Sequence, residues 1–135
     1  DNHAWIGWVG DSRVYHIRNG QILFRSKDHS LLQLLLDNED LSEREADSYP
    51  MKHVIYQALG PKGTRLNPSV ERIENIEHDD VFLLASDGVF EAWDDMELAY
   101  LTNQNMSDLA DQLYARCLER SSDNFTFTLV KALSQ

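Results

Sequence analysis

The run VFLLA at residues 81–85 is continuously apolar, and the residues SDG at 86–88 stop it. A continuous apolar run of this length predicts a strand that is covered on both faces. Ser-Asp-Gly is typical of a turn, because all three residues favour turn conformations. Asp87 is therefore expected at the end of a buried strand.

A second acidic pair, Asp123-Asn124, precedes the stretch FTFTLV at residues 125–130, whose alternation predicts a half-buried strand. If the two strands are antiparallel neighbours, Asp87 and Asp123 meet at one sheet edge. A carboxylate beside an apolar core is costly unless a cation or hydrogen bonds compensate for its lost hydration. The pattern favours a shared site for a hard divalent cation, while a turn-capping role for either aspartate stays open.

Composition limits the kind of molecule this is. With 135 residues and 42% hydrophobic content, the chain suffices for one domain and one core. Its longest apolar runs are short, so neither a signal peptide, a transmembrane span nor a membrane partner is expected. The single cysteine, Cys117, excludes an intrachain disulfide and favours a reducing, cytoplasmic compartment.

The formal charge of −11, from 23 acidic and 12 basic residues, argues against nucleic acid as a partner. A phosphorylated substrate remains compatible with this charge if bound cations reverse the sign of the local field.

The first part of the chain has β character. Residues 5–9 are an apolar strand candidate, and residues 14–18 and 21–25 flank Asn19-Gly20, which predicts a hairpin with a type I′ turn. A short helix is expected at residues 31–36, capped by Ser30 or Asp28.

The later part of the chain mixes helix and strand. Ser42 and Glu45 have capping-box spacing for a second short helix, and residues 70–76 are another strand candidate. Apolar residues recur at helical spacing over residues 94–101 and 107–118, with Ser107 as a plausible cap for the latter.

Five motifs occur along almost the whole chain in a recognisable order. They are Gly10-Asp11-Ser12-Arg13, Asp28-His29-Ser30, Ala58-Leu59-Gly60, Ser86-Asp87-Gly88 and Asp123-Asn124. In this order and with these gaps, the chain resembles the C-terminal portion of the bacterial PPM, or type 2C, metal-dependent protein serine/threonine phosphatases.

The resemblance implies an α+β fold, an antiparallel β-sandwich flanked by helices, of which this chain holds an incomplete part. It implies that residues 1–135 form the C-terminal part of a single phosphatase domain, with a flap-like excursion at about residues 37–52. It further implies that Asp87 and Asp123 are ligands of a Mn²⁺ or Mg²⁺ pair and that Asp11 helps to hold a third, weaker metal.

The activity implied by the resemblance is hydrolysis of phosphoserine and phosphothreonine in proteins by metal-activated water. The family's metal-bridging Asp-Gly-x-Gly-Gly motif does not occur in these 135 residues. The chain is therefore expected to be inactive alone, and the missing N-terminal segment or a second copy is expected to pair with its exposed sheet. The alternative is a non-catalytic module of the same fold with a regulatory or protein-binding role.

Within the motifs, three polar residues are expected to be structural. Arg13 is interpreted as a partner in a buried ion pair rather than a phosphate ligand. His29 and Ser30 are expected to fix a loop and to begin a helix, since adjacent Asp28, His29 and Ser30 point in divergent directions and cannot form a catalytic triad.

Overall fold

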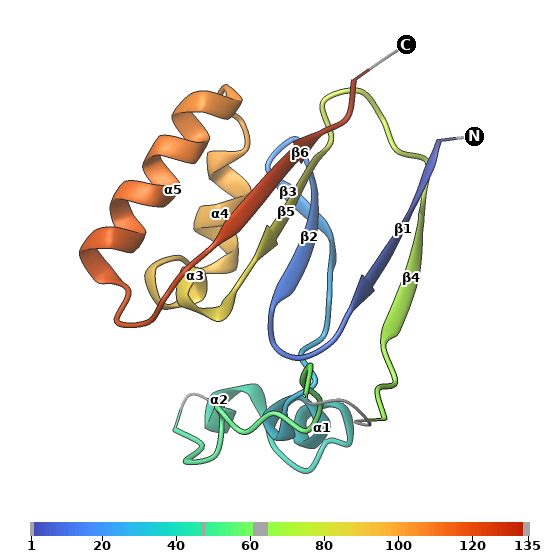
Figure 1. Ribbon diagram of the computed structural model, residues 1–135, viewed down its shortest axis with the longest axis vertical. Coiled ribbons are helices and arrows are strands. Elements are labelled where there is room, and N and C mark those ends of the chain that lie inside the picture. Colours follow the sequence, from blue (N-terminus) through green and yellow to red (C-terminus); the bar gives the residue numbers. More distant parts are fainter. Residues whose placement is uncertain (1, 47, 61–64, 134–135) are drawn as a thin grey trace.

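The computed structural model describes residues 2–46, 48–60 and 65–133, which form an α+β fold (Figure 1). The strands are β1 His3–Trp8, β2 Arg13–Arg18, β3 Gln21–Arg25, β4 Ser69–Glu74, β5 Val81–Ala85 and β6 Phe127–Lys131. The helices are α1 Leu31–Asp37, α2 Glu43–Ala46, α3 Asp87–Ala92, α4 Asp95–Leu101 and α5 Met106–Arg120.

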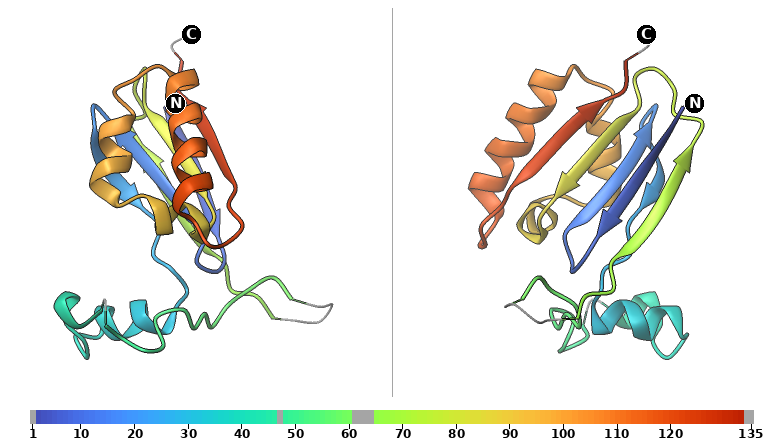
Figure 2. Two further views of the ribbon diagram at one scale, coloured as in Figure 1. Left: turned by 90° about the vertical axis from the view of Figure 1, so that its left-hand side faces the viewer. Right: turned by 45° about the vertical axis from the view of Figure 1, so that its right-hand side comes forward.

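Two antiparallel sheets form the centre of the molecule. One has four strands in the order β3-β2-β5-β6, and the other pairs β1 with β4. Helices α3, α4 and α5 cover one face of the larger sheet, while the two-stranded sheet lies on the other side (Figures 1 and 2). This arrangement confirms the expected β-sandwich flanked by helices, in incomplete form.

Strand β2 joins the two apolar cores, because its alternate side chains point to opposite faces. Tyr15 and Ile17 are fully buried in the larger core beneath the helices, together with Leu83 of β5. Val14 instead packs with Ile6 and Ile73 in the smaller core between the sheets. Four consecutive residues of β2 are buried because both faces of the strand are covered.

The hairpin predicted from Asn19-Gly20 is present between β2 and β3. Asn19 has φ 49° and Gly20 has φ 72°, the positive angles that a type I′ turn requires. The predicted strands at residues 5–9, 70–76 and 125–130 are also present as β1, β4 and β6, with ends displaced by one to two residues.

The helix ends follow local capping, with two corrections to the sequence analysis. Ser30 caps α1, since its side chain accepts a hydrogen bond from the Gln33 amide. The cap of α5 is Asn105 and not Ser107: the Asn105 side chain accepts from the Asp108 amide, so the helix begins one residue before Ser107. The Ser-Asp-Gly turn proves to be the start of helix α3, whose first residue is Asp87.

Helices α1 and α2 lie apart from the sheets, at the end where the β1–β2 turn, the β5–α3 junction and the α5–β6 loop meet (Figures 1 and 2). His29 fixes the base of this excursion, as expected. Its backbone carbonyl accepts from the Tyr56 amide, its Nδ1 accepts from the Gly10 amide at 3.2 Å, and its Nε2 lies 2.9 Å from Ser69 Oγ. Since Gly10 N–H can only donate, the proton of the ring is on Nε2 and is directed to Ser69.

Among the helices of the described ranges, none combines the length and the apolar character needed to cross a membrane.

Candidate metal-binding edge

Asp87 lies at the point where strand β5 becomes helix α3. The strand is buried on one face but not covered on both as the sequence analysis expected, because Leu84 is 42% exposed. Ser86 precedes it in extended conformation, and one oxygen of Asp87 accepts from the Gly88 amide at 3.0 Å. A carboxylate in the first helical turn is favoured by the helix dipole. The side chain is nevertheless exposed and available to a ligand.

Asp123 lies in the loop that leads from α5 into β6. The loop ends beside Asp87, because β5 and β6 are antiparallel neighbours and Ala85, at the end of β5, lies opposite Phe127, at the start of β6. This confirms the strand pairing expected from the sequence. The Asp123 carboxylate accepts from the amide of the next residue, Asn124, at 2.7 Å, and Asp123 is exposed. An Asx turn would instead bond the amide two residues on.

Asp11 lies in the turn between β1 and β2. Gly10 adopts φ 92° just before it, and Arg13 at the start of β2 pairs with Ala85 at the end of β5. The turn therefore reaches the same edge of the larger sheet. All three predicted aspartates lie on segments that meet there.

The charges of these aspartates act on one another. Partial burial, and then the negative charges of Asp11 and Asp123, raise the pKa of Asp87 above its ordinary value. The nearby cations Arg13, Arg25 and Lys27 pair with other carboxylates, namely Asp28, Asp95 and Asp37. Among the described residues, however, no group of three or more His, Cys, Asp and Glu side chains is placed closely enough to hold a metal ion.

A cavity of about 360 Å³ adjoins this edge. Its lining includes Asp11 and Asp87, the helix α3 residue Glu91, Lys52 at the end of the excursion, and His53, which follows it. The cavity thus places basic groups of one segment and acidic groups of another around one space.

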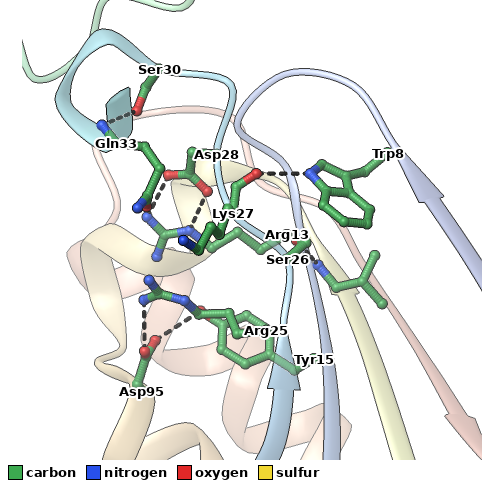
Figure 3. A network of polar contacts seen from close by, with 11 residues as sticks. Trp8, Arg13, Tyr15, Arg25, Ser26, Lys27, Asp28, Ser30, Gln33 and Asp95 are labelled. Carbon is green, nitrogen blue, oxygen red and sulfur yellow. Dashed lines mark hydrogen bonds and ion pairs between the residues drawn. The ribbon is translucent and has the colours of Figure 1, made fainter. Parts of the chain in front are cut away.

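Arg13 forms the ion pair that the sequence analysis expected, with Asp28 as its partner (Figure 3). Its Nε and Nη2 donate to the two oxygens of Asp28 at 2.8 and 2.7 Å, and its guanidinium lies 4.6 Å from the centre of the Phe90 ring. Both donors facing Asp28 are thereby occupied. Arg13 braces the wall of the cavity.

Glu91 is the residue of this region that the sequence analysis missed. It lines the cavity and accepts hydrogen bonds from Ser121 and Ser122, 30 residues further along the chain. Its spacing from Asp87 was the available signal, since residues four apart share one face of a helix. The helix was not predicted, because the sequence analysis assigned Ser-Asp-Gly to a turn.

Comparison with known proteins places the chain among phosphatases, although no family model matches it. It is 36% identical over 89 residues to the protein phosphatase PhpP of Streptococcus pneumoniae, a similarity covering 66% of this chain and 35% of that protein. It is 29% identical over 130 residues to the serine/threonine phosphatase stp of Listeria welshimeri, covering 93% of this chain and 50% of the relative.

Solved structures of serine/threonine phosphatases are also similar to this chain. A serine/threonine phosphatase of Staphylococcus aureus superposes with a TM-score of 0.84 and 30% identity over 98% of this chain and 52% of that one. The catalytic domain of the serine/threonine phosphatase PstP, determined with two manganese ions, gives a TM-score of 0.81 and 26% identity over 99% and 55%.

The fold is therefore that of a PPM-type phosphatase domain in incomplete form. With its five ordered motifs and these similarities, the chain belongs to the PPM, or type 2C, family of serine/threonine phosphatases. It spans about half, or less, of the length of the relatives it matches.

Proposed function

We propose that residues 1–135 are the C-terminal part of a single protein serine/threonine phosphatase domain that hydrolyses phosphoserine and phosphothreonine. The observation that carries this proposal is the acidic edge, where the segments bearing Asp11, Asp87 and Asp123 meet at the ends of β2, β5 and β6. Partial burial, and then the charges of Asp11 and Asp123, raise the pKa of Asp87. Carboxylates gathered in this way repel one another unless a ligand uses them.

We propose Asp87, Asp123 and Asp11 as ligands of Mn²⁺ or Mg²⁺, in a centre of two ions and a third, weaker one. The donor set fits hard cations, which prefer carboxylate oxygens. When bound, such ions neutralise phosphoryl oxygens and activate water. The residues of this chain hold the cations at the sheet edge, so that a phosphate can approach a chain of net charge −11.

Three carboxylates do not supply the roughly six oxygen ligands that each hard ion prefers. The Asp-Gly-x-Gly-Gly motif, which would add a bridging carboxylate, is absent from these residues. We therefore expect the 135-residue polypeptide alone to bind metal weakly and to show little or no turnover.

Apolar side chains remain uncovered on both sheets. Trp5 and Val70 are 66% and 58% exposed on the two-stranded sheet, and Leu84 and Val130 are 42% and 48% exposed on the larger one. Exposed apolar surface and open strand edges favour association. We propose that the half of the relatives' fold that the chain does not match, or a second copy, covers these sheets; light scattering separates the two.

The excursion at about residues 37–52 is proposed to act as a flap. Lys52, at its end, lines the cavity together with Asp87. A phosphorylated protein is the proposed substrate. We propose the cytoplasm as its compartment, because the one cysteine, Cys117, is a buried free thiol.

Manganese binding tests this function. Isothermal titration of the chain with Mn²⁺ should show weak binding that Asp87→Asn and Asp123→Asn abolish, while the control Asp79→Asn leaves it unchanged. An extended polypeptide with the upstream half should hydrolyse an aryl phosphate only with Mn²⁺ or Mg²⁺. Binding that survives both ligand substitutions would contradict the metal site, and an extended form that folds but has no activity would indicate a non-catalytic module.

A further inference from the structure

The loop that carries Asp123 is attached to helix α3 through one carboxylate. Oε2 of Glu91 accepts from the Ser122 amide at 2.6 Å, from Ser122 Oγ at 2.9 Å and from Ser121 Oγ at 3.3 Å. Residues 122–124 are exposed, so they have few packing contacts to hold them in place. Within the loop, Ser121 Oγ also lies 3.2 Å from the Asp123 carbonyl oxygen, so its single proton is shared with that acceptor. The bonds to Glu91 are the ones that attach the start of this loop to helix α3.

These bonds favour the ionised form of Glu91. Donation by the Ser122 amide, followed by donation from its hydroxyl, lowers the pKa of Glu91 below its ordinary value. Bonds to a charged acceptor are about twice as strong as neutral ones.

The end of the same loop is fixed from the β5–α3 junction. Ser86 Oγ accepts from the Thr126 amide at 3.0 Å. Gly88 approaches the loop so closely that an added Cβ would lie 2.5 Å from the carbonyl oxygen of Asn124. The segment bearing Asp87 therefore holds the segment bearing Asp123 at both ends.

We propose that Glu91 is a positioning residue, which fixes Asp123 relative to Asp87 without itself binding metal. The proposal rests on the function proposed above, in which both aspartates are ligands. Glu91 follows Asp87 by four residues, so the two carboxylates share one face of α3 and line one cavity. Oε2 of Glu91 accepts from both the amide and the hydroxyl of Ser122, which directs that oxygen to the loop and away from a cation.

A metal-free measurement tests the attachment first. Amide-proton exchange by NMR should be about tenfold faster at Ser122 and Asn124 in Glu91→Ala than in the unsubstituted chain, since the loss of a charge-assisted bond of this kind corresponds to about this factor. The amide of Leu129 in β6 should not change. Glu119→Ala, on the neighbouring helix α5, is the matched control.

Manganese binding tests the consequence. Removal of a residue that orients a ligand typically weakens metal affinity about tenfold or more, and we expect this for Glu91→Ala. Glu91→Gln keeps an acceptor oxygen for the Ser122 amide and removes the charge, so it should recover most of the affinity. A direct ligand or a simple charge effect would instead leave Glu91→Gln as weak as Glu91→Ala.

Each remaining outcome decides the proposal. Unchanged exchange at Ser122 in a folded Glu91→Ala variant overturns it, as does equal loss of affinity in the Gln and Ala variants. If the unsubstituted chain binds no Mn²⁺, the metal assignment of the proposed function fails, and with it the role of Glu91 toward a metal. Altered exchange at Ser122 would then still assign Glu91 as the anchor of the loop.

Discussion

Two groups of carboxylates in this molecule have opposite environments. At one end, Asp80 is completely buried and receives hydrogen bonds from Arg18, from His16 and from the Glu77 amide. Burial opposes its ionisation, but these donors outweigh burial and lower its pKa to about 2. At the other end, Asp87 has a raised pKa and two acidic neighbours.

The difference separates a structural carboxylate from one available for binding. Every donor around Asp80 comes from the protein, and the Arg18 guanidinium also contacts Glu77 and the carbonyl of Asn75. Asp87 and Asp123 are exposed, and each accepts a backbone hydrogen bond from the residue that follows it. A buried carboxylate whose donors all come from the protein stabilises the fold, whereas an exposed carboxylate beside other carboxylates can bind an external cation.

The largest effect should come from removing the charge of Asp80. Asp80→Asn removes the buried charge that Arg18 and His16 contact, and Arg18 keeps only the exposed Glu77 as an ion-pair partner. We expect a loss of about 3 kcal/mol in the free energy of unfolding. Urea denaturation measures this loss. Asp79→Asn is the control, because the pair of Asp79 with Lys131 is exposed and should contribute little to stability. Equal losses of stability in Asp80→Asn and Asp79→Asn would show that the buried carboxylate stabilises the fold no more than the exposed one.

Lowering the pH should weaken the contribution of ionised Asp80 to the stability of the fold. Because the pKa of Asp80 is lowered in the folded state, its ionisation stabilises the protein above the ordinary value of 3.8 and the effect is lost as pH falls toward 2. This amounts to about 2 kcal/mol. The difference in unfolding free energy between the unsubstituted chain and Asp80→Asn should therefore narrow over this range. A constant difference would show that the charge is not responsible.

The close approach of Gly88 to Asn124 should have the next largest effect. Gly88→Ala places a Cβ against backbone atoms that cannot rotate away, and we expect a loss of about 1–2 kcal/mol. Gly7→Ala is the control, since its Cβ would meet no atom closer than 3.8 Å. Thermal unfolding of both variants measures the difference. An unaltered stability of Gly88→Ala would mean that the two acidic segments are not held tightly together.

The smallest effect is expected at Asp87 itself, with the opposite sign. Its pKa is raised, so above that pKa its charge costs stability, and Asp87→Asn should gain a few tenths of a kcal/mol at pH 7 without metal. The gain should decrease with added salt and vanish at low pH. Melting temperatures in the presence of a chelator measure it. A loss of stability would place Asp87 with the structural carboxylates.

Local signals predicted much of the fold. Asn19-Gly20 indicated the β2–β3 hairpin because only a few residues tolerate its backbone angles, and the apolar runs indicated β5 and β6. Contacts between distant residues were not predictable in this way. Asp80 can be buried because it pairs with Arg18, 62 residues away. The role of Glu91 depends on helix α3, which was not predicted because Ser86-Asp87-Gly88 is also typical of a turn.

In the candidate site, too, the residues beside regular strands were predicted and the contacts between distant residues were not. The sequence indicated Asp87 and Asp123 because each adjoins a strand with a clear pattern, and their strands are indeed neighbours. The side chains that hold the Asp123 loop were not recognised, because serine and glutamate in exposed segments have no distinctive spacing.

The bonds of His29 have a consequence for how this protein can vary. They tie the start of the excursion to Gly10, Tyr56 and Ser69, so the chain between residues 31 and 54 leaves and returns at a point that is already closed. Lengthening a loop whose ends are fixed adds only slowly to the entropy lost on folding. Insertions, deletions or exchange of whole sequences should therefore be tolerated inside this segment, which makes it a natural place for related proteins to diverge and for a foreign peptide to be grafted.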